Sequence, residues 1–207
     1  MQEVTRAARR SGGETRSHVV AAAAELLEER GAAGLSVSAI MDRAGISRTA
    51  FYRQFDDVYG VVATLLETIA RELAENAGPW FNDENAVGSR DVIYGNALRS
   101  GRTIQPRIGL LAAIVDATAL DASLRTLWRE TVLQPRIDSA ARAIRRDQVA
   151  GQIPVSIDPD ATALALTLMG EQVALEILGR RGGSPEEYAA ILSPIWEAVL
   201  FGHTEHD

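Results

Sequence analysis

Apolar residues recur along most of this chain every three to four positions, the spacing of helices that bury one face. The first such segment spans 14–30 and ends before Gly31, a typical helix stop. A second, shorter one covers 37–44, and Ser36 before it is a favourable N-cap. Alternating runs of β-branched residues, which would predict strands, do not occur. The pattern therefore predicts an all-α protein.

A tight turn follows the second segment. Gly45 ends that helix, Ile46 is an apolar turn residue, and Ser47 caps a third helix that we expect to run to about Gln54. Two short helices joined by a glycine turn and packed on a longer first helix make a helix-turn-helix. We therefore expect three domains or segments: an Arg-bearing arm over 1–13, a helix-turn-helix domain over 14–56, and a larger helical domain over 57–207.

The larger domain begins with a connecting helix over 57–77 that Asp57 caps. Its inward positions at helical spacing are Val61, Leu65, Leu66, Ile69 and Leu73. Further helices are predicted at 88–101, 104–118, 121–150, from Asp158-Pro159 to about Arg180-Arg181, and from Ser184-Pro185 onward, about nine in all. Pro135 and Pro194 fall inside these patterns, and each should kink its helix or mark a break.

Composition adds a charge asymmetry. The 207 residues carry a formal charge of −7, and all 21 basic residues are Arg. Up to Phe55 eight Arg face six acidic residues, so this part is +2 and the remainder −9. A nucleic-acid-binding face needs local positive charge, and an acidic body limits non-specific adhesion. The asymmetry favours a basic head on an acidic body.

The segments 35–40 and 44–55 resemble the TetR family of transcriptional repressors. The matching features are the Ser-capped second helix, the Ala-Gly-Ile-Ser turn, and the aromatic-Tyr-x-x-Phe ending of the third helix, and the likeness extends over about 15–75. It implies a regulator that binds a double-stranded DNA operator. The side chains that we expect to contact DNA are Ser36, Ser38, Ser47, Arg48, Thr49, Tyr52 and Arg53.

Helical phase supports distinct roles for these residues. Ile46, Phe51 and Phe55 should pack inward. Arg48, Thr49 and Arg53 then point outward, at positions that a recognition helix places in the major groove. Arg can bond bidentately to guanine, and the Thr methyl can touch a thymine methyl. By the resemblance, Tyr52 contacts phosphate, the alternative being a half-buried packing residue. For Ser36, capping is favoured over contact.

One departure from the family stands at the start of the connecting helix. The family usually carries a phosphate-contacting Lys three residues after Phe55, but this chain has Val58 there, preceded by Asp56 and Asp57. The Arg-bearing arm or Arg16 could compensate, although the arm could equally be a solvated tail. The rival function is a helical protein that binds a small molecule or a partner and has a weakened DNA-binding head.

In the final two helices, the segments 166–172 (LTLMGEQ) and 195–202 (IWEAVLFG) resemble the subgroup typified by the mycobacterial regulator of ethionamide activation. On the penultimate helix, one side carries Leu164, Leu168 and Leu175. A different side of the same helix carries Leu166, Met169 and Val173. A second apolar face must be buried, which predicts a homodimer through the last two helices; interior burial is the alternative.

The family resemblance implies a small-molecule effector held in the larger domain, and the expected lining residues suggest a hydrophobic or amphipathic molecule. The expected ligand-binding residues combine its aromatic side chains with a few apolar and polar ones. They are Trp80, Phe81, Tyr94, Leu124, Trp128, Thr167, Met169, Gln172 and Trp196. For any single one of them, ordinary core packing is the competing interpretation.

Several classes are disfavoured. No cysteine is present, and His18, His203 and His206 are far apart, so we expect neither a metal site nor a cofactor. No nucleophile is paired with a base, which argues against an enzyme. No secretory signal and no apolar window of about 20 residues stands out, so we expect a cytoplasmic protein without a membrane segment.

Overall fold

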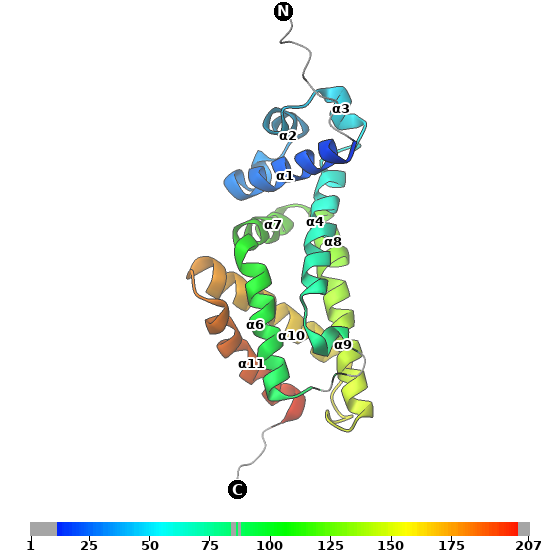
Figure 1. Ribbon diagram of the computed structural model, residues 1–207, viewed down its shortest axis with the longest axis vertical. Helices are drawn as coiled ribbons and strands as arrows, with labels where there is room; N and C mark the ends of the chain where they lie inside the picture. Colours follow the sequence, from blue (N-terminus) through cyan, green and yellow to red (C-terminus); the bar gives the residue numbers. More distant parts are fainter. Residues whose placement is uncertain (1–11, 84–85, 87, 203–207) are drawn as a thin grey trace, which may run out of the picture.

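The computed structural model describes residues 12–83, 86 and 88–202, and this part of the chain is helical with no strand. It forms a small head and an elongated body, with the N-terminal end at the head and the C-terminal end at the far end of the body (Figure 1). Arg6, Arg9 and Arg10 of the predicted arm lie outside the described residues. The prediction of an all-α fold is confirmed.

The head consists of three helices and a 3-10 turn. Their bounds are α1 (Gly12–Arg30), the turn Ala32–Gly34, α2 (Val37–Ala44) and α3 (Arg48–Tyr52). Both predicted serine caps are present: Ser36 Oγ and Ser47 Oγ each accept a hydrogen bond at 3.2 Å from the backbone N–H three residues on. Gly45 ends α2 with φ 64°, a left-handed conformation that glycine adopts without strain. The third helix is shorter than predicted, because Arg53 and Gln54 already belong to the following turn.

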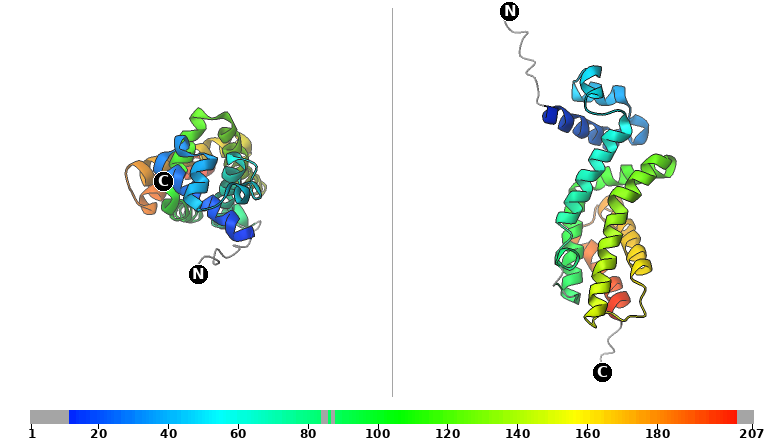
Figure 2. Two further views of the ribbon diagram at one scale, coloured as in Figure 1. Left: turned by 90° about the horizontal axis from the view of Figure 1, so that it is seen from above. Right: turned by 90° about the vertical axis from the view of Figure 1, so that its right-hand side faces the viewer.

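Helix α4 (Val58–Glu75) connects the head to the body. Asp57 caps it by accepting a hydrogen bond from Gly60 N at 2.8 Å. It leaves the head and runs along most of the body (Figure 2). All five residues predicted to face inward are buried. Val61 belongs to the core of the head, whereas Val62, Leu65, Leu66, Ile69 and Leu73 belong to the core of the body.

The body is a bundle of the remaining helices. Their bounds are α5 (Pro79–Asn82), α6 (Arg90–Ile104), α7 (Ile108–Leu120), α8 (Ala122–Trp128), α9 (Gln134–Val149), α10 (Pro159–Ala174) and α11 (Pro185–Phe201). A 3-10 turn, Gln105–Arg107, lies between α6 and α7. Helix α11 lies beside α6, and α10 beside α9 (Figure 1). Asp158 and Ser184 cap α10 and α11 as predicted, each followed by a proline in the first turn.

The two internal prolines behave differently. Pro135 follows a π-helical turn, Arg129–Leu133, that joins α8 and α9 into one continuous helix. The wider turn accommodates a residue that has no N–H to donate and whose ring would clash with a carbonyl in a regular α-helix. Pro194, by contrast, lies within α11, which stays continuous. A second π-helical turn, Leu175–Arg180, extends α10 to the predicted end.

Candidate DNA interface and ligand cavity

The recognition helix α3 presents one apolar and one polar side. Phe51 and Phe55 are buried in the head core, and Ile46 packs against it, as predicted. Arg48 is exposed, and its guanidinium carbon lies 5.3 Å from the centre of the Tyr52 ring. This cation–π contact holds the arginine over the exposed tyrosine. The Arg48 guanidinium and the Tyr52 hydroxyl are therefore both accessible to a nucleic acid.

All seven residues predicted to contact DNA are exposed. Ser36 and Ser38 stand at the first turn of α2, and the other five lie between the N-cap of α3, Ser47, and its C-cap, Arg53. Ser36 and Ser47 are engaged as caps, so their hydroxyls are oriented by the backbone N–H groups. The structure thus brings these seven side chains to one end of the molecule, at the head.

Ion pairs fix α2 against α1. Arg43 donates to Glu25 Oε2 at 2.9 Å and forms two further hydrogen bonds with Glu29. The hydrogen bond from Arg43 lowers the pKa of Glu29 below its ordinary value, and the two glutamates raise the pKa of Arg43. Arg43 of α2 thus bridges two carboxylates of α1 and holds the two helices together.

The start of α4 departs from a phosphate-binding design. Val58 is half-buried and packs against both the head core and the body core. Arg16, which we considered as a substitute cation, donates to Gln54 O at 3.0 Å and to Thr64 Oγ1 at 2.8 Å. Its guanidinium also lies 4.3 Å from the centre of the Phe55 ring. Arg16 therefore ties α1 to the junction of α3 and α4.

A side-chain contact links the head end of α4 to the body. Tyr59 Oη donates to Asp121 Oδ2 at 2.8 Å, and Asp121 caps α8. Hydrogen bonds from Leu124 N and then from Tyr59 lower the pKa of Asp121. The same bond raises the pKa of Tyr59. This hydrogen bond therefore connects the first turn of α4 to the junction of α7 and α8.

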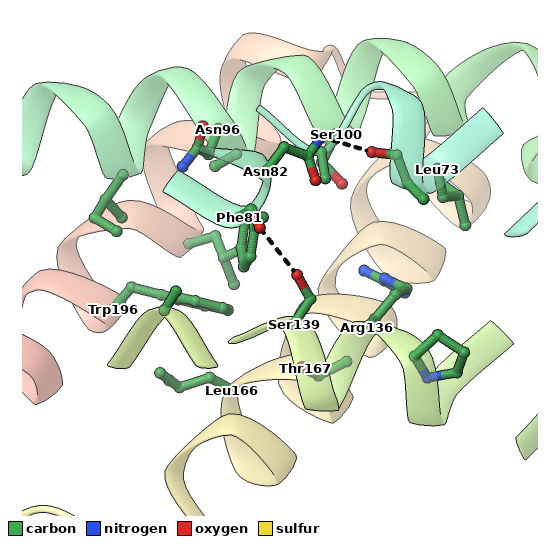
Figure 3. Close-up of a pocket in the computed structure, with 18 of the residues that line it drawn as sticks. Leu73, Phe81, Asn82, Asn96, Ser100, Arg136, Ser139, Leu166, Thr167 and Trp196 are labelled. Carbon is green, nitrogen blue, oxygen red and sulfur yellow. Dashed lines mark hydrogen bonds between the residues drawn. The ribbon is translucent and has the colours of Figure 1, made fainter. Parts of the chain in front are cut away.

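A large cavity of about 720 Å³ lies in the body. Residues of α4, α5, α6, α9, α10 and α11 line it, so segments far apart in the sequence meet there (Figure 3). Its wall is mainly apolar, with a few polar side chains, as is usual for small-molecule sites. The polar and charged residues among those that line it include Asn96, Ser100, Arg136, Ser139, Thr167 and Ser193.

The cavity contains three of the nine residues proposed from the sequence as ligand contacts, Phe81, Thr167 and Trp196. The other six lie elsewhere. Trp80, Leu124 and Met169 pack in or against the body core, Trp128 borders a much smaller neighbouring cavity, and Tyr94 and Gln172 are exposed. Tyr94 and Gln172 project from faces of α6 and α10 that do not border the cavity.

Sequence reasoning missed Asn96, Ser100 and Arg136. The first two share the helical spacing of Ile93, Ala97 and Ile104, and Asn96 is buried with these apolar residues. Polar residues on an otherwise apolar helix face are the signal that could have found them. No comparable pattern marks Arg136.

A buried network supports the cavity at the α5 end. Asp147 Oδ2 accepts hydrogen bonds from Trp80 Nε1 at 2.7 Å and from Gly88 N at 2.8 Å, and Arg146 Nε donates to Asp147 Oδ1 at 3.0 Å. A Cβ atom at Gly88 would lie 2.5 Å from the Asp147 carboxylate, so the close approach requires glycine. The Trp80 ring packs edge-on against Phe81 and Trp196, whose rings border the cavity.

Helices α10 and α11 carry an exposed apolar face. Leu164, Leu168, Ile191, Ile195 and Val199 are each about 40% exposed. By length and composition, one helical stretch of the described chain, 159–180, could cross a membrane. In this fold it packs against α9 and α11 on its inner side, so the additional apolarity lies on the outer face.

In the segments that the structure describes, no group of three or more His, Asp or Glu side chains is placed to hold a metal ion.

Two family models match the chain. The model of bacterial regulatory proteins of the tetR family covers residues 19–63, and the model of the C-terminal domain of the transcriptional regulator EthR covers residues 99–202. The HTH-type transcriptional regulator EthR of Mycolicibacterium smegmatis is 28% identical over 204 residues, which is 95% of this chain and 91% of that protein. The EthR protein of Mycobacterium tuberculosis is 29% identical over 200 residues, 95% of this chain and 92% of that protein.

Solved structures share the fold. A TetR-family transcriptional regulator from Syntrophomonas wolfei superimposes with a TM-score of 0.81 at 13% identity, covering 95% of this chain and 100% of that one. A structure titled as the SmeT–triclosan complex gives a TM-score of 0.74 at 20% identity, covering 93% and 94%. At these identities the likeness concerns the fold alone.

The head, the connecting helix and the family matches define a DNA-binding transcriptional regulator, and the chain belongs to the TetR family. Within that family it is a member of the EthR subgroup, because the EthR C-terminal model spans half of the chain and EthR relatives align over most of it. The fold and the relatives are those of regulators and not of enzymes.

Proposed function

We propose that this protein is a cytoplasmic repressor that binds a palindromic operator as a homodimer and is released by a small hydrophobic or amphipathic molecule. The observation that carries the proposal is α4, which begins at the head beside α3 and borders the body cavity with Ala70, Leu73 and Ala74. One rigid element thereby joins the DNA-reading end to the site where a ligand would bind.

The exposed side of α3 supports the DNA-binding part of the proposal. Arg48 and Thr49 stand at the beginning of the recognition helix, where residues of this motif reach base edges. Tyr52, one turn later, is exposed and suited to the phosphate backbone, and Arg53 next to it is exposed as well. Ser36 and Ser38 lie near the N-terminus of α2, where the helix dipole favours an anion.

The outer face of α10 and α11 supports the homodimer. Five large apolar side chains exposed on two adjacent helices form a patch that a second copy would bury as a four-helix bundle. Two-fold symmetry would place the recognition helices about one DNA turn apart, ~34–36 Å, and thus match a palindromic operator.

The cavity supports release by a ligand. Its volume of about 720 Å³ lies in the range of small-molecule sites. A relative of the same fold, SmeT, has a structure titled as a complex with triclosan. A ligand that fits best when α4 is displaced would shift the head away from its DNA-bound position.

One observation favours a second candidate, a small-molecule-binding or partner-binding protein with a weakened DNA-binding head. Val58 packs into the core where the family usually has a phosphate-contacting lysine, and Asp56 and Asp57 beside it are exposed. These acids would repel the phosphate backbone at the start of α4.

Binding to duplexes from the region upstream of its own gene, measured by fluorescence anisotropy over a range of salt, decides between the two. We expect sequence preference and a steep negative slope of log affinity against log salt concentration.

Arg48→Ala should reduce discrimination between the operator and its variants by about 1–3 kcal/mol, whereas Tyr52→Phe should weaken binding to all sequences alike. The same effect from both variants would contradict the separation of base and phosphate contacts. Failure of the wild-type protein to bind any duplex at low salt would contradict the repressor function.

A further inference from the structure

The wall of the body cavity is positively charged, although the chain as a whole is negative. Helix α9 contributes Arg136, Arg142 and Arg146 to the lining, and the only acidic residue among the described lining residues is Asp83. The lining therefore carries a formal charge of +2 in a protein of net charge −7. An apolar cavity with such a wall attracts negative charge, because its low dielectric strengthens the field of each arginine.

The three arginines differ in how they are neutralised. Arg146 pairs with the buried Asp147 and donates to Trp80 O and Asp83 O, each at 3.0 Å. Arg142 is exposed to solvent. Arg136 is half-buried and has no hydrogen bond or ion pair within the part of the chain that the structure describes. Arg136 is therefore the one of these three arginines that is half-buried and has no carboxylate of the described residues within ion-pairing distance.

Glu171 is the acidic residue to consider as a partner for Arg136, since both side chains line the smaller neighbouring cavity. The two do not approach within ion-pairing distance among the described contacts, and Glu171 Oε2 is itself buried without a hydrogen bond. Burial raises the pKa of Glu171, against the opposing effect of the Arg136 charge, and so favours its neutral form more than for an ordinary glutamate. Glu171 thus lies near Arg136 without an ion pair or hydrogen bond to it, and the guanidinium N–H groups of Arg136 stay open to a ligand.

The remaining polar atoms of the cavity also favour an acceptor. Asn96 Nδ2 and Trp196 Nε1 are buried, line the cavity and have no hydrogen-bond partner. Asn96 is 4% exposed, and its other amide atom, Oδ1, faces Gly78. Both unpartnered groups are N–H donors, and a buried donor left without an acceptor costs about 1–3 kcal/mol. A ligand oxygen placed beside these two donors would remove this cost, separately from the group that meets Arg136.

The donors and the charge lie at different ends of the site. In Figure 3, Trp196 and Asn96 lie toward one side of the cavity and Arg136 toward the other, with Phe81 between them and Leu166 below Trp196. Leu73 of α4 is drawn close to the Arg136 end. A ligand that reaches Arg136 with a charged group would thus lay an apolar body along Phe81 and Leu166.

We infer that the effector is an amphipathic anion whose acidic group, a carboxylate or one of similar charge, pairs with Arg136 while its apolar body fills the cavity. This inference rests on the proposed ligand-responsive function and specifies the ligand class of the same site. The ion pair would form beside α4, the helix that leads to the DNA-binding head. Arg136 is accordingly the residue that determines specificity for charge.

The test compares three ten-carbon probes that differ in charge: decanoate, 1-decanol and decylamine. Isothermal titration calorimetry on the full chain at neutral pH should give binding of decanoate about 10- to 100-fold tighter than of 1-decanol, and weakest binding of decylamine. Arg136→Met removes the charge and keeps most of the side-chain length. In that variant the affinities for decanoate and 1-decanol should become equal, while 1-decanol binding stays as in the wild type.

Arg99→Met is the matched control, because Arg99 is an exposed arginine of α6 outside the cavity lining. It changes the net charge equally and should keep the preference for decanoate. Equal wild-type affinity for decanoate and 1-decanol, preference for decylamine, or no decanoate binding at about 1 mM would each overturn the inference. So would a preference retained in Arg136→Met. Titration of the same preparation with operator duplex distinguishes failure of this inference from failure of the proposed function. If the operator still binds while the preference for decanoate is absent, only the inference about the ligand is wrong.

Discussion

The Asp147→Ala variant is expected to lose about 3–5 kcal/mol of its free energy of unfolding. Asp147 is fully buried (0% exposed), and its carboxylate accepts hydrogen bonds from Trp80 Nε1, Gly88 N and Arg146 Nε. Its removal leaves a guanidinium, an indole N–H and a backbone N–H without their acceptor in the core. Urea denaturation followed by circular dichroism at fixed protein concentration measures the loss.

Asp138→Ala provides the control for this effect. Asp138 is an exposed carboxylate of the same helix, α9, and it accepts one hydrogen bond from Gln134 at 2.8 Å. Its replacement should change the free energy of unfolding by no more than about 0.5 kcal/mol. A loss below about 1 kcal/mol in Asp147→Ala would show that the network around Trp80 contributes little to the stability of the body. Since that network packs Trp80 against Phe81 and Trp196, the stability of the cavity wall is measured at the same time.

The double variant Leu168→Glu, Ile195→Glu should be monomeric and should bind its operator about 10²–10⁴-fold more weakly than the wild type. Leu168 on α10 is 40% exposed and Ile195 on α11 is 41% exposed. Carboxylates there remain hydrated in the isolated chain but would face each other across a two-fold interface, where burying them is costly. Light scattering at micromolar concentration gives the mass, and anisotropy titration gives the operator affinity.

Leu120→Glu is the matched control for the dimer variant. Leu120 ends α7, is 90% exposed and lies away from α10 and α11, so it places a new carboxylate on the surface outside the proposed interface. It should keep the dimer mass and the operator affinity of the wild type. Dimer mass in the double variant would contradict an interface on α10 and α11, and a monomer in the wild type would contradict the homodimer altogether.

Much of the fold follows from short-range chemistry. The caps at Ser36, Ser47 and Asp57 form because each side chain needs only the N–H groups of the turn that follows it. The apolar spacing of α4 requires only that one face be buried, and all of its predicted inward residues are. Helix α3 ends earlier than expected, a difference that lies within the usual uncertainty of helix ends.

The candidate DNA interface was accessible to the same reasoning because its seven residues lie within 36–53, on two short helices and one turn. The cavity was not. Its wall combines α4, α5, α6, α9, α10 and α11. Aromatic content and the family resemblance directed the prediction to Trp80, Tyr94 and Trp128 as well as to Phe81 and Trp196. Whether an aromatic ring borders an empty space depends on the helices that pack around it, which periodicity does not specify.

Helix positions, their caps and the polar face of α3 were thus decided by local hydrogen bonding and by the need to bury one side of each helix. The helix-turn-helix and its TetR-family assignment rest on that local level. Tertiary packing alone decided that Val58 fills the junction between two cores, that Arg16 is used within the head, and that Arg136 stands without a partner in a cavity. Each of these depends on contacts between residues distant in the chain, and the cost or gain of a buried charge is set by those neighbours and not by its own position in a helix.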